Sequence, residues 1–242
     1  MTTPALWRDL RQYTAARVAL GRAGNGLPTE AQLAFQAAHA AARDAVHAEL
    51  DIPTLQTALA RPSRTVRSAC PDRRTYLLRP DLGRRLHDLD RVMLEQEKAN
   101  NSIVFVLCDG LSAIAVQRHA AAVIAELNPD GPIIIARQGR VALGDDIGAA
   151  LGAAAVVVLI GERPGLSSPD SLGAYLTWAP RPGRTDAERN CISNIRPEGL
   201  PIPQAAAKLS WLIKEMRTRK LTGIALKDNS PAQVRSISEV ST

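Results

Sequence analysis

Three short apolar runs in the second half of the chain constrain the fold more than any other feature of the sequence. They span residues 103–107, 133–135 and 156–160 and are rich in isoleucine and valine. Helical patterns at residues 112–127 and 145–151 separate them, and this alternation is typical of a parallel β-sheet with helical crossovers. Because the runs are apolar throughout, helices should cover both faces of the sheet. We therefore predict an α/β fold, a Rossmann-like parallel sheet flanked by helices.

The end of the chain completes this predicted α/β domain, which we place at residues 101–228. An apolar stripe that includes Leu209 and Met216 predicts a last helix, and residues 224–226 are expected to form a short edge strand. Residues 229–242 are polar, and we expect them to form a disordered tail.

Residues 1–100 are expected to form a mainly helical N-terminal region. Apolar residues recur at helical spacing over residues 6–20. A second, alanine-rich helix should follow, because Thr29 and Gln32 have the spacing of a capping box at its start.

The pattern then breaks before a further helix. Three prolines interrupt residues 51–79, where we expect loop with one short strand at residues 75–78. Pro80 should open a helix that continues to Met93, because proline is favoured in the first turn and leucines share one face after it.

The positive charge of the chain raises the question of a nucleic-acid partner. The chain has 30 Lys and Arg against 24 Asp and Glu, a formal net charge of +6. Its dense basic stretch, residues 61–85, lacks the aromatic side chains on which bases stack, and aromatic residues make up only 3% of the chain. We expect a solvated or partner-facing surface there and no nucleic-acid binding.

The cysteines and the apolar runs indicate a cytosolic protein. Cys70, Cys108 and Cys191 are far apart, with neither a Cys-x-x-Cys pair nor nearby histidines, so neither disulfides nor a zinc site is predicted. The longest apolar run, residues 153–161, is shorter than the roughly 18 residues that a membrane-spanning helix needs. The first residues have no signal-peptide pattern.

Ligands of open α/β sheets gather at the carboxyl ends of the strands, and three segments follow the predicted strands there. They are residues 108–112, 137–141 and 161–165, and each places a glycine beside polar side chains. The sequence alone thus predicts an α/β protein with a ligand crevice.

Several common motifs are missing from these segments. There is neither a Gly-x-Gly-x-x-Gly fingerprint nor a phosphate-binding P-loop, which argues against the alternative of a nicotinamide-dependent α/β oxidoreductase. A Gly-x-Ser-x-Gly nucleophile elbow and a His-x-x-Gly cobalt-ligating pattern are also absent. A histidine of this chain is therefore not expected to serve as a cobalt ligand.

Single residues leave alternatives open at this stage. Asp109 fits a helix cap as well as a functional group. Glu162 fits a ligand contact or a salt bridge to Arg163 or Arg140. Cys191 taken by itself fits a small buried hydrophobic residue.

The same segments resemble the light chain of ethanolamine ammonia-lyase. The similarity extends over about residues 8 to 226, with separated motifs in the order that the family has. The matching stretches are residues 14–18, 21–24, 78–86, 109–112, 139–141, 159–166 and 191–195.

The resemblance implies a lyase that converts ethanolamine to acetaldehyde and ammonia by a radical mechanism with adenosylcobalamin. It implies that a large subunit, an eight-stranded β/α barrel, binds ethanolamine, and that cobalamin lies between the two subunits. It further implies a hetero-oligomer of three dimers of heavy–light pairs. We expect a cytoplasmic location; the alternative is a bacterial microcompartment, to which a longer amino-terminal extension directs some relatives.

The resemblance also implies which residues contact the cofactor. Val141, Glu162 and Cys191 occupy the positions that bind cobalamin in the family, and Asp109 and Ser112 are weaker candidates. Catalytic residues and metal ligands are not assigned to this chain, because the resemblance places the substrate on the large subunit.

Overall fold

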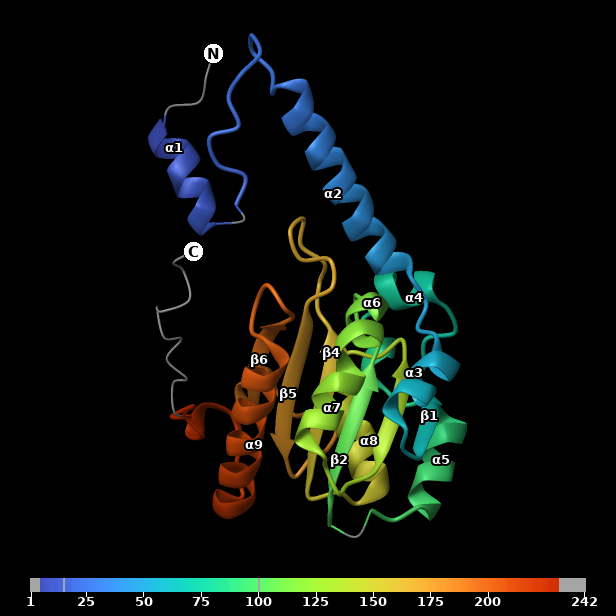
Figure 1. Cartoon of the computed structure of the whole chain (residues 1–242). Coiled ribbons are helices and arrows are strands. Elements are labelled where there is room, and N and C mark those ends of the chain that lie inside the picture. The colour runs from blue at the N-terminus through green and yellow to red at the C-terminus, as the bar shows by residue number, and fades with distance from the viewer. Residues whose placement is uncertain (1–4, 15, 100, 231–242) are drawn as a thin grey trace.

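A six-stranded mixed β-sheet lies at the centre of this computed structural model, which describes residues 5–14, 16–99 and 101–230. The strands are β1 (Ser63–Arg67), β2 (Ile103–Cys108), β3 (Ile133–Arg137), β4 (Ala155–Gly161), β5 (Leu172–Trp178) and β6 (Arg189–Ile195). They lie in the order β1-β3-β2-β4-β5-β6 (Figure 1). The α/β class and the strands predicted from the three apolar runs are confirmed.

The prediction that the whole sheet is parallel is wrong. β1, β3, β2 and β4 are parallel, but β5 runs antiparallel to β4, and β6 runs antiparallel to β5. A parallel crossover usually needs a connection of a dozen or more residues that includes a helix, whereas residues 162–171, between β4 and β5, form no helix. The chain therefore returns directly as an antiparallel strand.

Two hydrophobic cores lie on the two faces of the sheet. The helices are α6 (Ala113–Ala115), a π-helical turn η3 (Val116–Ala120), α7 (Ala121–Leu127), α8 (Leu143–Leu151) and α9 (Ile202–Arg219). Residues of α6, η3, α7 and α9 pack with Phe105 and Leu107 on one face. α8 packs with Val104 and Val106 on the other face. Helices on both faces explain why β2 and β4 are buried along their whole length.

Of the first helices, α2 (Thr29–His47) packs against the α/β region only near its carboxyl end. α1 (Ala5–Leu10) and a 3-10 turn η1 (Arg11–Tyr13) are shorter than the predicted helix, and the described residues from 14 to 20 are not helical. α2 extends away from the sheet in Figure 1, and Ala45 is its only buried residue. The prediction of a capping box at Thr29 and Gln32 is wrong, because Pro28 is the N-cap and no side chain caps the helix.

The prolines of residues 51–79 do not make this segment a loop. α3 (Ile52–Leu59) begins at Asp51, whose carboxylate accepts the Thr54 backbone N–H at 3.1 Å. Pro53 lies in the first turn of α3, where a missing N–H costs nothing. Residues 75–78, predicted as a strand, belong to α4 (Arg73–Leu78), which Asp72 caps. The strand of this segment is β1 instead, which pairs with β3.

The helix predicted from Pro80 is also divided. A 3-10 turn η2 (Leu82–Arg84) precedes α5 (Asp88–Gln96), and the extended residues between them pair with the chain after β1 through a Ser68–Leu86 bridge. Tertiary pairing therefore overrides the leucine periodicity. α5 lies against α8 on the second face of the sheet.

The last helix, α9, forms as predicted, but the edge strand expected at residues 224–226 does not form. Residues 223–225 form a 3-10 turn η5 (Gly223–Ala225). In the predicted tail, residues 231–242 lie outside the described residues. Over the described part of the chain, no helix combines the length and the apolar character that crossing a membrane requires.

Candidate functional site

The three residues predicted to contact a cofactor lie on the same side of the sheet. Val141 lies between β3 and α8, Glu162 follows β4, and Cys191 is in β6. Cys191 is directly opposite Tyr175 in the β5–β6 ladder, and opposite residues share a face. Val141 and Tyr175 both pack against the core beneath α8. The fold therefore gathers residues from three elements on the face that α8 covers only in part.

Glu162 is held in place by neutral hydrogen-bond donors. Its half-buried carboxylate accepts the Ser171 hydroxyl and, at 3.1 Å, the backbone N–H of Asn194. Among the described residues it forms no ion pair, so the salt bridge to Arg163 or Arg140 is not present. Glu162 thus keeps further lone pairs that can accept hydrogen bonds from a ligand.

Gly173 provides the space for this carboxylate. A Cβ atom at Gly173 would lie 2.9 Å from Glu162 Oε1 and 3.1 Å from Glu162 Cγ. Any other residue here would push the Glu162 side chain away from its present position. Sequence reasoning missed Gly173, because it did not predict β5.

Tyr175 and Cys191 form the next part of the same face. Cys191 is exposed, with its Sγ 3.4 Å from the Ser193 hydroxyl, so the reading of Cys191 as a buried hydrophobic residue is wrong. Burial, the neighbouring Cys191 thiol and the negative charge of Glu162 raise the pKa of Tyr175 above its usual value. Its phenol therefore stays protonated and able to donate a hydrogen bond.

A cavity of about 690 Å³ opens beside Val141. Its lining includes Asp186 and five arginines: Arg84, Arg140, Arg163, Arg184 and Arg189. Arg184 pairs with Glu188, and Arg189 pairs with Asp145 and Asp186. The other three arginines have no carboxylate partner within the described ranges. The cavity consequently concentrates positive charge beside Val141.

Comparisons with known proteins show the family of this chain. The sequence model of the family described as "Ethanolamine ammonia-lyase light chain" matches residues 4–227. The chain belongs to the ethanolamine ammonia-lyase light-chain family. Relatives named "Ethanolamine ammonia-lyase small subunit" are 52% identical in Xanthomonas campestris (95% of this chain and 90% of the relative) and 53% identical in Azotobacter vinelandii (93% and 88%). One from Bradyrhizobium diazoefficiens is 52% identical over 95% of each chain.

The weaker candidates of this light-chain family member have structural roles. The buried Asp109 carboxylate accepts the backbone N–H groups of Gln138, at 2.8 Å, and Gly139, at 3.2 Å. Ser112 rather than Asp109 caps α6, and its hydroxyl also donates to the Pro169 carbonyl at 2.8 Å. Both residues fasten the loops together beneath the site, and neither is exposed to a ligand.

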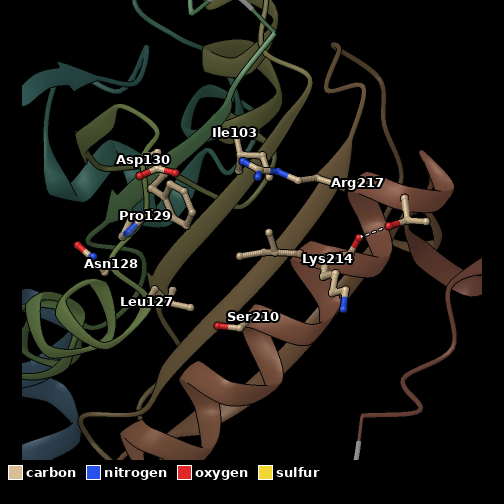
Figure 2. Close-up of a pocket in the computed structure, with 11 residues that line it drawn as sticks. Ile103, Leu127, Asn128, Pro129, Asp130, Ser210, Lys214 and Arg217 are labelled. Atoms are coloured by element: carbon tan, nitrogen blue, oxygen red, sulfur yellow. Dashed lines mark hydrogen bonds between the residues drawn. The ribbon is translucent and has the colours of Figure 1, made fainter.

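A second cavity of the light-chain fold lies at the amino ends of the parallel strands. Its volume is about 450 Å³, and Lys214 and Arg217 of α9 are among the residues that line it. Figure 2 shows it between residues 127–130 and α9. Ile103 at the start of β2 lines it, whereas Val141 follows the end of the parallel strand β3. The second cavity is therefore remote from the three predicted contacts, and its two cations provide controls for experiments on the first.

Proposed function

We propose that this chain is the small subunit of an adenosylcobalamin-dependent ethanolamine ammonia-lyase. The enzyme converts ethanolamine to acetaldehyde and ammonia, and the face bearing Val141, Glu162 and Cys191 holds cobalamin against the large subunit. The convergence of these three residues on one side of the sheet is the observation that carries the proposal. The names of the relatives support the reaction.

The side chains of this face fit a corrinoid. The periphery of the corrin ring carries amide groups, and the Glu162 carboxylate can accept their N–H groups in charge-assisted hydrogen bonds. Val141 offers apolar surface, and Tyr175 offers a phenol donor. Cys191 is exposed, so a flat ligand can reach this part of the face. When bound, adenosylcobalamin supplies the radical chemistry of the reaction.

This chain contributes binding and orientation and does not perform proton transfer. In the proposal, ethanolamine is bound by the large subunit, and the enzyme is a cytoplasmic assembly of three dimers of heavy–light pairs. Within the described residues, no three His, Cys, Asp or Glu side chains are grouped as metal ligands.

Co-expression with an ethanolamine ammonia-lyase large subunit tests the proposal. The purified complex should release acetaldehyde from ethanolamine only when adenosylcobalamin is added, and this chain alone should release none. Stable complex formation without cobalamin-dependent acetaldehyde release, or failure to form a complex with any such large subunit, would overturn it.

A further inference from the structure

Arg84, Arg140 and Arg163 line the cavity beside Val141 without carboxylate partners in the described chain. We propose that they form a phosphate-binding site that takes the phosphodiester of the cobalamin nucleotide tail. The inference rests on the proposed function and adds to it the chemical group that each arginine recognises.

Arg140 is fixed in position before any ligand binds. Its guanidinium carbon lies 4.3 Å from the ring centroid of the buried Tyr76, whose hydroxyl donates to the Gly139 carbonyl at 3.1 Å. On the other side, the Arg140 backbone N–H donates to the Gly83 carbonyl at 2.7 Å. A Cβ at Gly83 would lie 3.1 Å from Arg140 Cγ, so a glycine accommodates the side chain closely. Stacking and close packing remove most of the freedom that an arginine loses on binding.

The hydrogen-bonding capacity of Arg140 is largely unused. Its buried Nε has no partner, and its Nη2 makes one long contact, 3.4 Å, with the Tyr76 carbonyl. Buried guanidinium groups are normally paired, because an unpartnered donor costs free energy. Arg140 therefore offers the cavity a preorganised guanidinium group. The exposed Arg84 and Arg163 add two further positive charges to its lining.

The chemistry of the cavity favours a phosphate as its anion. Guanidinium groups bind phosphate oxygens through paired N–H donors, and several can share one phosphate. Arg184 and Arg189 already have carboxylate partners, which leaves the other three cations unbalanced around the cavity.

The positions of these arginines identify which phosphate they bind. Arg140 directly precedes Val141, and Arg163 directly follows Glu162, so both adjoin proposed corrin contacts. The phosphodiester is the one anionic group of cobalamin.

The test compares three corrinoids on the assembled complex by absorbance titration. Cobalamin carries the complete nucleotide tail, cobinamide phosphate carries a phosphate without the base, and cobinamide carries neither. The exposed arginines are changed together as Arg84→Gln/Arg163→Gln, and Arg140→Gln is made separately. Lys214→Gln/Arg217→Gln at the second cavity is the matched control for removing two positive charges.

We expect both arginine variants to weaken binding of cobalamin and of cobinamide phosphate by about tenfold or more, as the loss of charge-assisted hydrogen bonds predicts. Cobinamide should bind to these variants as it does to the unmodified complex, and the control should bind all three corrinoids normally. The double variant of exposed side chains keeps the test valid should Arg140→Gln disturb folding.

Three outcomes would overturn the inference. The first is an equal loss of affinity for all three corrinoids, and the second is unchanged affinity for all of them. The third is weaker assembly of the corrinoid-free subunits, which would show that the arginines pair with carboxylates of the large subunit. In each case the unmodified complex still binds cobalamin and the proposed function stands. An unmodified complex that binds no corrinoid would overturn both.

Discussion

Arg189 in β6 and Asp145 in α8 form a bidentate ion pair in which two guanidinium nitrogens each donate to a carboxylate oxygen at 2.7 Å. Both side chains are only 2% exposed. Arg189 also donates to the Thr177 hydroxyl at 2.9 Å and to the Arg184 carbonyl at 2.9 Å. The pair thus ties the antiparallel edge of the sheet, which carries Cys191, to the helix that follows Val141.

Removal of the carboxylate should strongly destabilise the fold. Asp145→Ala leaves a buried guanidinium without its counterion, and we expect a loss of about 3–5 kcal/mol in the free energy of unfolding. Urea denaturation followed by circular dichroism measures it. Asp186→Ala is the control, because the Asp186 side chain is 100% exposed and lies 3.4 Å from Arg189; its effect on stability should be much smaller, since solvent screens an exposed ion pair. Similar losses for the two variants would contradict a special role for the buried pair.

Replacement of Glu162 should weaken the binding of cobalamin to the assembled enzyme. Glu162→Ala removes the charged acceptor and should raise the Kd by about tenfold or more, and Glu162→Gln should have a smaller effect because one acceptor oxygen remains. Absorbance titration measures the Kd. Glu126→Ala, an exposed residue of α7, is the matched control. Unchanged affinity in Glu162→Ala would remove Glu162 from the site.

Gly173→Ala should act on the cofactor through Glu162. The added methyl group would approach the end of a movable side chain, so we expect little change in stability but a displaced carboxylate and weaker cobalamin binding. In a double-mutant cycle, Gly173→Ala should have almost no further effect once Glu162 is alanine. Full additivity of the two changes would show that Gly173 acts independently of Glu162.

Stability should fall in acid as Glu188 is protonated. The Thr185 backbone N–H and the Arg184 guanidinium lower the pKa of Glu188 from 4.5 to about 2. Because the folded-state pKa is depressed, this contribution is present above pH 4.5 and is lost as the pH falls toward 2. Glu188→Gln should therefore be less stable than the parent protein at pH 7, and the difference should shrink between pH 4.5 and 2 in urea titrations. A difference that is constant over this range would be inconsistent with the ion pair.

Cys191 should report directly on the occupied site. It is exposed, whereas Cys70 and Cys108 are buried, and burial raises the pKa of both buried thiols. Iodoacetamide should therefore label Cys191 first in the isolated chain, and mass spectrometry can locate the label. In the complex, cobalamin should slow the labelling of Cys191. Labelling at the same rate with and without cobalamin would place Cys191 away from the cofactor.

The sequence predicts β2, β3 and β4 because continuous apolar runs have few alternatives in a folded protein, but it misses β1 and β5. It fails at β6, whose polar residues alternate with buried ones at the sheet edge, and at α4, which depends on the Asp72 cap. The rule that ligands gather at strand ends selected the loops of Val141 and Glu162, and the fold brings these two residues to one side of the sheet. The same rule also selected Asp109, which the fold uses to join two loops.

The sequence by itself determined the α/β class, the family and the strand ends at which Val141 and Glu162 lie, because these follow from local apolar runs and ordered motifs. Only the tertiary structure decided that Cys191 and Tyr175 lie on the same face of the sheet as Val141 and Glu162, since the side to which a strand residue points depends on register. Tertiary structure also brought arginines from separate loops around one cavity. Such charge clusters depend on long-range packing, which places residues together irrespective of their distance along the chain.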